Sequence, residues 1–232
     1  MVYKDKVITE CRLCFSTSLI EVIDFGRIAL GNNLHKKIEQ AEQAKTYPLC
    51  LLKCDECNHF QLSFSVNPIN LYANNYTYTS SIAASFVRHL NNSAEDILKH
   101  LSEKNKKYKV LEVGSNDGTA LIPFKEKGCF VLGVDPAKIP SQIANKKGIK
   151  TINKFFSKDL SIEIIKQYEN FDIVISHNVL AHVENLHDVF EWIYNILKDD
   201  GVLIFEIGYF KSLIDNIIFD TIYHEHLDYH TK

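Results

Sequence analysis

The stretch that decides the fold is Val110-Leu111-Glu112-Val113-Gly114-Ser115-Asn116-Asp117-Gly118, a β-rich run that ends in a glycine-containing turn. The residues that follow, Thr119 to Lys127, have the pattern of a helix. Glycine lets the backbone approach a ligand closely, and the start of a helix offers free N–H groups. Asp135 ends a second β-rich run, 17 residues after Gly118, where a carboxylate can accept both hydroxyls of a ribose. Together these features predict a nucleoside-binding site.

The residues around this turn favour S-adenosylmethionine over a nicotinamide dinucleotide. The dinucleotide pattern Gly-x-Gly-x-x-Gly is broken, because Asn116 stands at the middle glycine position. Glu112, two residues before the first glycine, suits the cationic methionyl end of S-adenosylmethionine better than a pyrophosphate. Phe155 and Phe156, after the third strand position, can flank the adenine, although such a pair is more often part of the core. A nicotinamide oxidoreductase is the alternative enzyme class.

The predicted cofactor site gathers residues at the carboxyl ends of the strands. Its members are Glu112, Gly114, Ser115, Asn116, Asp117, Gly118, Asp135, Pro136, Phe156, His177 and Asn178. His177 and Asn178 are included because they follow the fourth strand, at the edge of the sheet where ligands of α/β proteins bind. Glu206, at the end of the fifth strand, can also point into the cleft. His182 and His187 are expected to face solvent or to cap a helix.

Beyond the turn, β-rich runs alternate with helical segments, which is the doubly wound α/β pattern. The buried parallel strands are predicted at Lys109–Val113, Phe130–Val134, Asp172–Ser176 and Val202–Ile207. Ahead of them, apolar residues at helical spacing predict a long helix from about Ser81 to Lys104, capped by Ser80 or Ser81. A further helix is expected from about Tyr209 to Phe219.

The first 70 residues or so are irregular and turn-rich, because Asp24-Phe25-Gly26, Gly31-Asn32-Asn33 and Pro48 interrupt any long periodicity. We therefore predict three consecutive parts, which are a zinc-binding domain at 1–70, a helical connector with a tyrosine-rich segment at 71–105, and a cofactor-binding domain at 106–232.

Two Cys-x-x-Cys pairs supply four thiolates, namely Cys11, Cys14, Cys54 and Cys57. Each pair can place both sulfurs on one tetrahedral ion at about 2.3 Å, so the pattern predicts a structural zinc site without an open coordination position. The 39 residues between the pairs predict a substantial loop. The alternatives are His35 or His59 in place of one sulfur, or four unrelated buried cysteines. Cys50 and Cys129 are not paired by spacing and are expected to pack as small apolar groups.

The bulk composition is that of a soluble globular protein of 232 residues, 46% of them apolar. The net charge is −3, and only three of the 26 basic residues are arginines, so nucleic acid is not an expected partner. The first six residues lack the apolar core of a signal peptide and the apolar runs are short. We therefore expect a cytoplasmic protein that does not span a membrane.

Several motifs occur together along the chain. They are the two cysteine pairs, residues 76–81 (Tyr-Thr-Tyr-Thr-Ser-Ser), 110–118, 133–137 (Gly-Val-Asp-Pro-Ala), 177–183 (His-Asn-Val-Leu-Ala-His-Val) and 219–226 (Phe-Asp-Thr-Ile-Tyr-His-Glu-His). In this order and spacing the chain resembles, over nearly its whole length, the sugar C-methyltransferases that act on nucleotide-linked keto-deoxysugars. The resemblance implies a class I methyltransferase, Rossmann-like sheet and methyl transfer from S-adenosylmethionine to a sugar carbon next to a ketone. It also implies a nucleotide-linked sugar substrate and a zinc ion that serves structure only.

Such a reaction needs a base for the proton α to the carbonyl, a group that steadies the enolate oxygen, and a sulfonium methyl in line about 3 Å from the carbanion. The resemblance implies that His226 is the base and that Glu225 and Tyr223 assist. By residue type alone, the Tyr-His-Glu-His cluster can equally be a surface turn or a metal site. The resemblance places Tyr76 and Tyr78 in a substrate wall, with aromatic packing as the alternative for Tyr78. Tyr76, which can donate a hydrogen bond to the keto sugar, is predicted as the fourth catalytic residue.

The chain is expected to be a fragment or one half of a split enzyme. A class I methyltransferase sheet has seven strands, whereas the predicted strands stop at five, and family members continue into a second α/β domain. We expect an exposed fifth strand, no turnover by this chain alone, and a downstream polypeptide that completes the fold. The alternatives are a non-catalytic remnant that binds S-adenosylmethionine, a small-molecule methyltransferase of other specificity, and a zinc-ribbon adaptor for nucleic acid.

Overall fold

The computed structural model describes residues 3–73, 76–101 and 106–231. The chain forms two compact units that alternate along the sequence. Unit 1 comprises Met1–Tyr76, Asn178–His187 and Ile207–Lys232, and unit 2 comprises Thr77–His177 and Asp188–Glu206. Residues 178–187 and 207–232, which the sequence division put in the 106–232 part, thus belong by their contacts to unit 1. The domain boundaries at 70 and 105 stay predictions.

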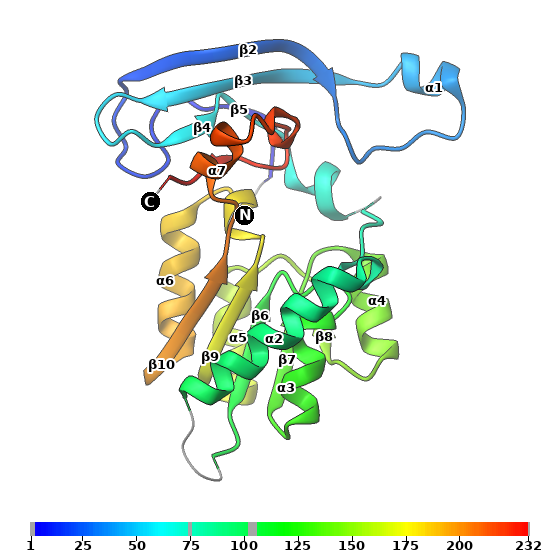
Figure 1. Cartoon of the computed structure of the whole chain (residues 1–232), viewed down its shortest axis with the longest axis vertical. Coiled ribbons are helices and arrows are strands. Elements are labelled where there is room, and N and C mark those ends of the chain that lie inside the picture. Colours follow the sequence, from blue (N-terminus) through cyan, green and yellow to red (C-terminus); the bar gives the residue numbers. More distant parts are fainter. Residues whose placement is uncertain (1–2, 74–75, 102–105, 232) are drawn as a thin grey trace. The chain divides into compact units, whose positions relative to one another are not determined.

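Unit 2 is built on a parallel sheet of five strands, shown in Figure 1. In spatial order these are β10 (Leu197–Glu206), β9 (Phe171–His177), β6 (Lys109–Val113), β7 (Phe130–Val134) and β8 (Thr151–Ile152). Every neighbouring pair is parallel. The order reverses between β6 and β9, which is the switch point at which ligands of doubly wound sheets bind. The predicted doubly wound fold and its four predicted strands are confirmed.

Helices and 3-10 turns connect these strands. They are η2 (Ser80–Ile82), α2 (Ala84–His100), η3 (Thr119–Leu121), α3 (Ile122–Glu126), α4 (Lys138–Lys146), α5 (Lys158–Tyr168) and α6 (Leu186–Ile196). Ala94 of α2, Phe124 of α3 and Ala144 of α4 share one buried cluster with the sheet residues Val110 and Ile173. The three helices therefore cover the same face, and Figure 1 shows α2 crossing it.

The predicted cap of the long helix is wrong. The helix α2 begins after Ala83, which makes no side-chain capping bond. Both serines are engaged elsewhere, since the Ser80 N–H donates to Asn116 Oδ1 (2.9 Å) and the Ser81 side chain hydrogen-bonds to Asp117. The predicted end of the helix, up to residue 104, lies outside the described residues.

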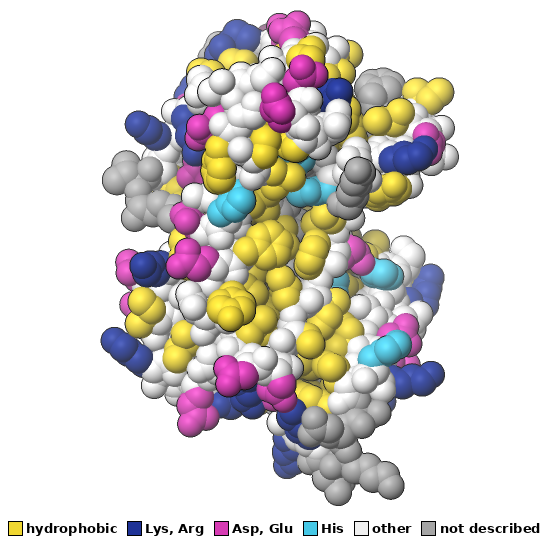
Figure 2. All heavy atoms as spheres, turned by 90° about the vertical axis from the view of Figure 1, so that its left-hand side faces the viewer, with side chains coloured by type: hydrophobic (Ala, Val, Ile, Leu, Met, Phe, Trp, Pro, Cys, Tyr) yellow, Lys and Arg dark blue, Asp and Glu magenta, His cyan; other side chains and the backbone are white. Residues whose placement is uncertain are grey.

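The strand β10 forms one edge of the sheet. In the described part of the chain it pairs with β9 alone. This agrees with the prediction that the fifth strand lies at an unpaired edge. Phe205 on β10 is 45% exposed and packs edge-on against Phe190 of α6, with ring centroids 5.9 Å apart. Figure 2, which looks at the side that carries α6 and β10, shows hydrophobic side chains gathered on that face, while acidic and basic side chains are interspersed around them.

Unit 1 contains a four-stranded antiparallel sheet in the order β11 (Asp228–Tyr229), β4 (Phe60–Leu62), β3 (Thr46–Cys54) and β2 (Leu19–Ala29), and a small sheet of β1 (Lys6–Val7) with β5 (Phe64–Ser65). Its short helical elements are α1 (Ile38–Glu42), η1 (Ile69–Ala73), η4 (Leu180–His182), α7 (Phe210–Asp215) and η5 (Phe219–Thr221). Leu62, Phe210 and Leu227 meet in one buried cluster. The carboxyl-terminal segment is therefore part of the core of this unit.

The prediction of an irregular amino-terminal part is wrong, because β2 and β3 are long strands. Gly26, read as part of a turn, lies in a bulge inside β2, with φ at +75° and its N–H bonded to Asp24 Oδ1 (2.8 Å). Pro48 lies in β3 beyond the Leu51–Lys53 stretch that pairs with β4, so its missing N–H breaks no bond on that side.

The predicted helix from Tyr209 to Phe219 is shorter than expected. The helix α7 ends at Asp215 because Ile217 takes a left-handed conformation, with φ at +56°. The Ile218 N–H then bonds to the Leu213 carbonyl (2.8 Å), which closes the end of the helix. None of the helices in the described ranges is both long enough and apolar enough to cross a lipid bilayer.

Candidate functional site

The four predicted zinc ligands come together in unit 1. The Sγ atoms of Cys11, Cys14, Cys54 and Cys57 all lie within 4.8 Å of one another. The pairs interlock, since Cys11 Sγ lies 3.5 Å from Cys57 Sγ and Cys14 Sγ lies 3.6 Å from Cys54 Sγ. The histidine alternatives are wrong, because among the described residues the four cysteine sulfurs form the cluster without a histidine, while His59 Nε2 is bonded to Asp228 (2.8 Å) and His35 Nε2 to Asn33.

The chemistry of this cluster fits a divalent cation. Burial raises the pKa of the Cys54 thiol, but the N–H groups of Cys57 and Glu56 outweigh that effect and bring it down to about 7. Burial, together with the neighbouring thiols, raises the pKa of Cys57 to about 12. Four thiolates this close therefore need a cation to neutralise them, and tetrahedral zinc accepts four sulfurs. The sequence-predicted set is the one that would hold zinc.

The glycine turn of unit 2 has the backbone geometry that the sequence predicts. The N–H groups of Gly114 and Ser115 both bond to the Val134 carbonyl, at 2.8 and 3.1 Å, which ties the turn to the end of β7. Gly114 and Gly118 both have φ at +76°. A side chain at Gly118 would also meet Ile149 at 3.0 Å. Glycine is therefore required at 118 both by backbone conformation and by space.

Glu112 is a buried carboxylate at the end of β6. Its Oε1 lies 3.1 Å from His177 Nδ1. Its Oε2 and the buried Ser115 Oγ have no hydrogen-bond partner in the described part of the chain. Burial raises the pKa of Glu112, while the Glu112 carboxylate raises the pKa of His177 against the burial that would lower it. Two unpaired polar atoms on a glycine turn are the expected condition of a site that awaits a polar ligand.

Asp135 is held by the backbone at the end of β7. Its two oxygens accept hydrogen bonds from the N–H groups of Asn116 (2.8 Å) and Ala137 (2.7 Å). Burial raises the pKa of Asp135 to about 6, although those two N–H groups act against the shift. A carboxylate oxygen has more than one lone pair, so both oxygens can still accept from a ribose.

Asn116 and Asp117 make contacts within unit 2. Asn116 Nδ2 donates to the Tyr78 carbonyl (3.1 Å), and its Oδ1 accepts from Ser80, so this side chain fastens the segment before α2 to the glycine turn. Asp117 is fully buried, pairs with Lys147 (2.9 Å) and accepts from Thr119 Oγ1 (2.6 Å). Their predicted contact with the cofactor stays a prediction, and these partners give both side chains a structural task as well.

The contacts of the other predicted cofactor residues, Phe156, Pro136 and Asn178, do not point to a ligand. Phe156 is partly buried and packs edge-on against Trp192, with centroids 6.2 Å apart. Pro136 follows Asp135, and its carbonyl accepts from Asn153 (2.9 Å). Asn178 is exposed, has φ at +55° and belongs to unit 1. For these residues too, the role in cofactor binding stays a prediction.

The predicted catalytic residues lie together in unit 1. His226 Nδ1 lies 2.8 Å from the Thr221 carbonyl, which can only accept, so Nδ1 carries the proton. Burial lowers the pKa of His226, so the ring is neutral near pH 7. Its Nε2 therefore carries the lone pair and lies 3.2 Å from the Tyr223 hydroxyl. This arrangement gives His226 the tautomer of a base.

Two members of the cluster around His226 were missed at the level of sequence, namely His182, which contacts His226, and Tyr72, which contacts His182. His182, expected to face solvent, is instead partly buried, with its ring 4.9 Å from that of His226 and stacked on Tyr72 at 5.8 Å. Burial and the nearby His226 lower the pKa of His182 to about 3. Tyr72 also packs against Tyr76 (5.8 Å). His182 carried a weak sequence signal, since it stands with His177 and Asn178 in one motif, whereas Tyr72 carried none.

Glu225 lies beside this group. Its Oε1 accepts from Asn32 Nδ2 (2.6 Å), and its carbonyl accepts from the Tyr72 hydroxyl (3.1 Å). Burial raises the pKa of Glu225. All four predicted catalytic residues thus fall in unit 1, and the predicted cofactor residues other than Asn178 fall in unit 2.

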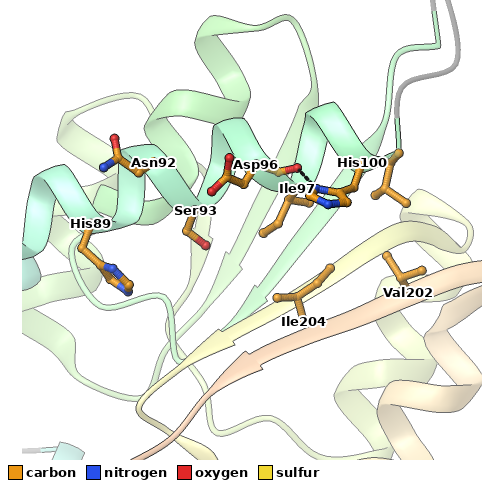
Figure 3. A pocket seen from close by; sticks show the side chains of 9 residues that line it. His89, Asn92, Ser93, Asp96, Ile97, His100, Val202 and Ile204 are labelled. Atoms are coloured by element: carbon orange, nitrogen blue, oxygen red, sulfur yellow. Dashed lines mark hydrogen bonds between the residues drawn. The ribbon is translucent and has the colours of Figure 1, made fainter.

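Unit 2 also has a hollow of about 490 Å³ between α2 and β10. Figure 3 shows His89, Asp96 and His100 on the helix α2, across from Val202 and Ile204 of β10, with His100 bonded to the carbonyl of Asp96 (2.8 Å). None of the predicted site residues lines this hollow. It is separate from the glycine turn.

A four-thiol zinc site and a doubly wound sheet with a glycine turn define a class of zinc-containing α/β proteins that bind nucleosides. A family model described as "Methyltransferase domain" matches residues 86–232, and one described as "Putative zinc binding domain" matches residues 11–72. The chain belongs to the methyltransferase domain family. The fold and family predicted from sequence are therefore confirmed.

Curated relatives agree with this family. The C-methyltransferase NovU of Streptomyces niveus is 31% identical over 222 residues, which is 96% of this chain and 52% of the relative. The ubiquinone biosynthesis O-methyltransferase of Glaesserella parasuis is 30% identical over 101 residues, 41% of this chain and 43% of the relative. The chain spans about half the length of these relatives.

Solved structures give weaker likenesses. The plantazolicin methyltransferase BpumL, in complex with a triazolic desmethylPZN analog and SAH, has a TM-score of 0.49 at 18% identity, covering 58% of this chain and 52% of that one. DesVI of Streptomyces venezuelae has a TM-score of 0.45 at 15% identity, covering 59% and 61%. The class of fold here rests on the strand order of this chain's own sheet.

Proposed function

We propose that this chain is the S-adenosylmethionine-binding and zinc-binding part of a C-methyltransferase that acts on a nucleotide-linked keto-deoxysugar. One observation carries the choice of C-methylation. The similarity to NovU extends over 96% of the chain and so includes residues of both units, whereas the ubiquinone O-methyltransferase of Glaesserella parasuis matches 41%. The four cysteines of the zinc site lie outside residues 86–232, which the methyltransferase family model matches, so the similarity to NovU also covers a part of the chain that this model leaves out.

In this proposal unit 2 holds the methyl donor. The unpaired Oε2 of Glu112 accepts from the cationic methionyl group, and Asp135 accepts from the ribose hydroxyls. The backbone of the glycine turn comes close to the ligand because Gly114 and Gly118 leave room for it. When bound, the cofactor supplies an electrophilic methyl group on a sulfonium.

In the same proposal, His226 of unit 1 is the base. Its neutral Nε2 takes the proton α to the ketone, and the electrons of the broken C–H bond form the enolate. The enolate carbon would then be the nucleophile, and S-adenosylmethionine held by Glu112 and Asp135 would supply the methyl group, with a C–C bond formed for the S–C bond broken. Tyr223 and Glu225 assist at the oxygen of the enolate, where a hydrogen-bond donor stabilises the developing charge.

The test is deuterium exchange at the sugar carbon next to the ketone, measured in D2O with a panel of nucleotide-linked keto-sugars and with the product S-adenosylhomocysteine present. The chain is assayed alone and together with a polypeptide that corresponds to the part of NovU that it does not cover, and exchange is expected with both polypeptides present. We expect exchange with the wild type and a loss of roughly 100-fold or more in His226→Gln, because general base catalysis contributes about 10²- to 10⁴-fold. His100→Gln, a change at an exposed histidine that bonds to the Asp96 carbonyl of its own helix, is the matched control.

O-methylation is the competing function, which the ubiquinone O-methyltransferase relatives support. Transfer to a hydroxyl needs no proton from carbon. Methyl transfer from labelled donor without any α-proton exchange would therefore favour an O-methyltransferase. Tight binding of S-adenosylhomocysteine without exchange or transfer on any sugar would favour a non-catalytic binding protein.

A further inference from the structure

One arginine extends from the zinc site toward the segments of unit 1 that carry His182 and His226. Arg12 stands between the ligands Cys11 and Cys14, and its side chain is only 7% exposed. Its Nε donates to Asp228 Oδ1 (2.9 Å), its Nη1 donates to the Glu184 carbonyl (3.0 Å), and its Nη2 donates to the Val183 carbonyl. All three nitrogens of the guanidinium are therefore used, in the planar fork that lysine cannot reproduce.

Residues beside both cysteine pairs contact the carboxylate of Asp228. His59, two residues after Cys57, brings its Nε2 to 2.8 Å from Asp228 Oδ1, the oxygen that also accepts from Arg12. Burial alone would raise the pKa of Asp228, but Arg12 and His59 hold it below the ordinary value. The other oxygen, Asp228 Oδ2, has no partner in the described part of the chain. The side-chain hydrogen bonds of this buried carboxylate therefore come from the two zinc-binding segments.

The acceptors of Arg12 lie on the two segments that carry His182 and the predicted base His226. Val183 and Glu184 directly follow His182, and Asp228 comes two residues after His226. The two segments also bond to each other, since the Leu227 N–H donates to the Ala181 carbonyl (2.8 Å). One guanidinium therefore joins both histidine segments at points one or two residues from the rings.

The backbone of Arg12 is also fixed by hydrogen bonds. Its backbone N–H donates to Gln61 Oε1 (2.8 Å), and Gln61 Nε2 donates back to the Glu10 carbonyl (3.0 Å). Gln61 is fully buried in β4, opposite Asp228 of β11. The Cys11–Cys14 segment, β4 and β11 therefore form one connected block.

We propose that Arg12 is a positioning residue, which transmits the geometry of the zinc site to His182 and His226. The inference rests on the proposed function, because it assigns His226 the role of base. It changes the expectation that zinc serves structure only. The metal fixes Arg12, and Arg12 fixes the ring of the base.

The test compares Arg12→Gln and Arg12→Lys with Arg27→Gln, a matched control at an exposed arginine that donates to the Thr46 carbonyl. Metal analysis measures zinc per chain, and NMR titration follows the ring resonances of His182 and His226. We expect full zinc content in every variant. In both Arg12 variants we expect the pKa of each ring to rise toward the ordinary value as the segments loosen.

In the α-proton exchange assay, kcat should fall roughly 10- to 100-fold in Arg12→Gln with KM changed much less, because a small displacement of a catalytic group costs about that much. Arg12→Lys should not restore it. Should Arg12→Gln fold poorly because Asp228 loses its partner, Arg12→Gln/Asp228→Asn removes both charges. That double variant should fold, bind zinc and still lose kcat.

Unchanged histidine titration and unchanged kcat in zinc-loaded Arg12→Gln would overturn the inference, as would full activity of the double variant. A wild type that exchanges no α-proton, even together with a polypeptide that corresponds to the uncovered part of NovU, refutes the proposed function instead. In that case the histidine titration still decides whether Arg12 places the two segments.

Discussion

Asp135 is predicted to bind the ribose of the cofactor, and its ionisation bears on both cofactor binding and folding. A charged carboxylate is the stronger acceptor for ribose hydroxyls, but burial raises the pKa of Asp135 to about 6. We expect Asp135→Ala to weaken S-adenosylhomocysteine tenfold or more, since unpaired buried partners cost about 1 to 3 kcal/mol. Asp159→Ala, at an exposed carboxylate of α5, is the control. Calorimetry with unchanged affinity and intact folding would count against this placement of the cofactor.

Cofactor affinity and the stability of the fold should depend on pH in opposite directions. Affinity should fall as the pH drops through about 6 in the wild type, because protonation removes the acceptor, and this loss should be absent in Asp135→Ala. Folding behaves in reverse. A carboxyl whose pKa is higher in the folded than in the unfolded chain stabilises the fold below about pH 4, and that contribution is lost as the pH rises through about 6.

At the scale of elements, the pairing of β7 with the glycine turn depends on Gly133. A Cβ at this position would lie 2.8 Å from both Ser115 Cβ and Thr151 Oγ1, with β8 on one side and the turn on the other. We expect Gly133→Ala to destabilise the protein by about 1 to 3 kcal/mol, the usual cost of overpacking. Gly208→Ala, where a Cβ meets nothing within 4 Å, should change stability by less than about 0.5 kcal/mol. Equal melting temperatures for the two variants would refute this reading.

The elements also show which patterns in a sequence carry information. The strands β6, β7 and β9 were predictable because a run buried on both faces is apolar throughout, and the carboxyl ends of parallel strands meet at one edge. The helix cap was not, because Ser80 and Ser81 bond to residues that follow by more than 30 positions. Likewise β11 has only two residues, too few for any periodicity, yet it carries Asp228.

The residues of the candidate site also fall into those that the sequence indicated and those that it did not. The four cysteines and Glu112 were found because metal ligands and strand-end acids have a recognisable spacing. Arg12 and Tyr72 were not found, because their importance lies in partners more than 150 residues away in the sequence. Spacing reveals local ligand sets, whereas contacts between distant segments become visible only in the folded chain.

On the scale of the whole molecule, zinc and the cofactor should stabilise different, non-contiguous sets of residues. Unit 1 gathers residues 178–187 and 207–231 around the zinc-binding segments, and unit 2 holds the glycine turn. We expect Cys54→Ser to lose zinc and to accelerate amide hydrogen exchange in residues 3–73, 178–187 and 207–231 together. Structural zinc contributes about 10 to 16 kcal/mol in small zinc units, so the effect should be large.

The same experiment should leave residues 106–177 nearly unchanged, while S-adenosylhomocysteine should slow exchange there and not in the zinc-binding segments. Cys129→Ser, a cysteine of unit 2 that packs against its core, is the control and should keep its zinc. The decisive segment is 178–187, because it is flanked in sequence by unit 2 but grouped by contacts with unit 1. If it keeps its protection when Cys54→Ser exposes residues 3–73, the zinc site does not support the His182 segment and the link through Arg12 fails with it.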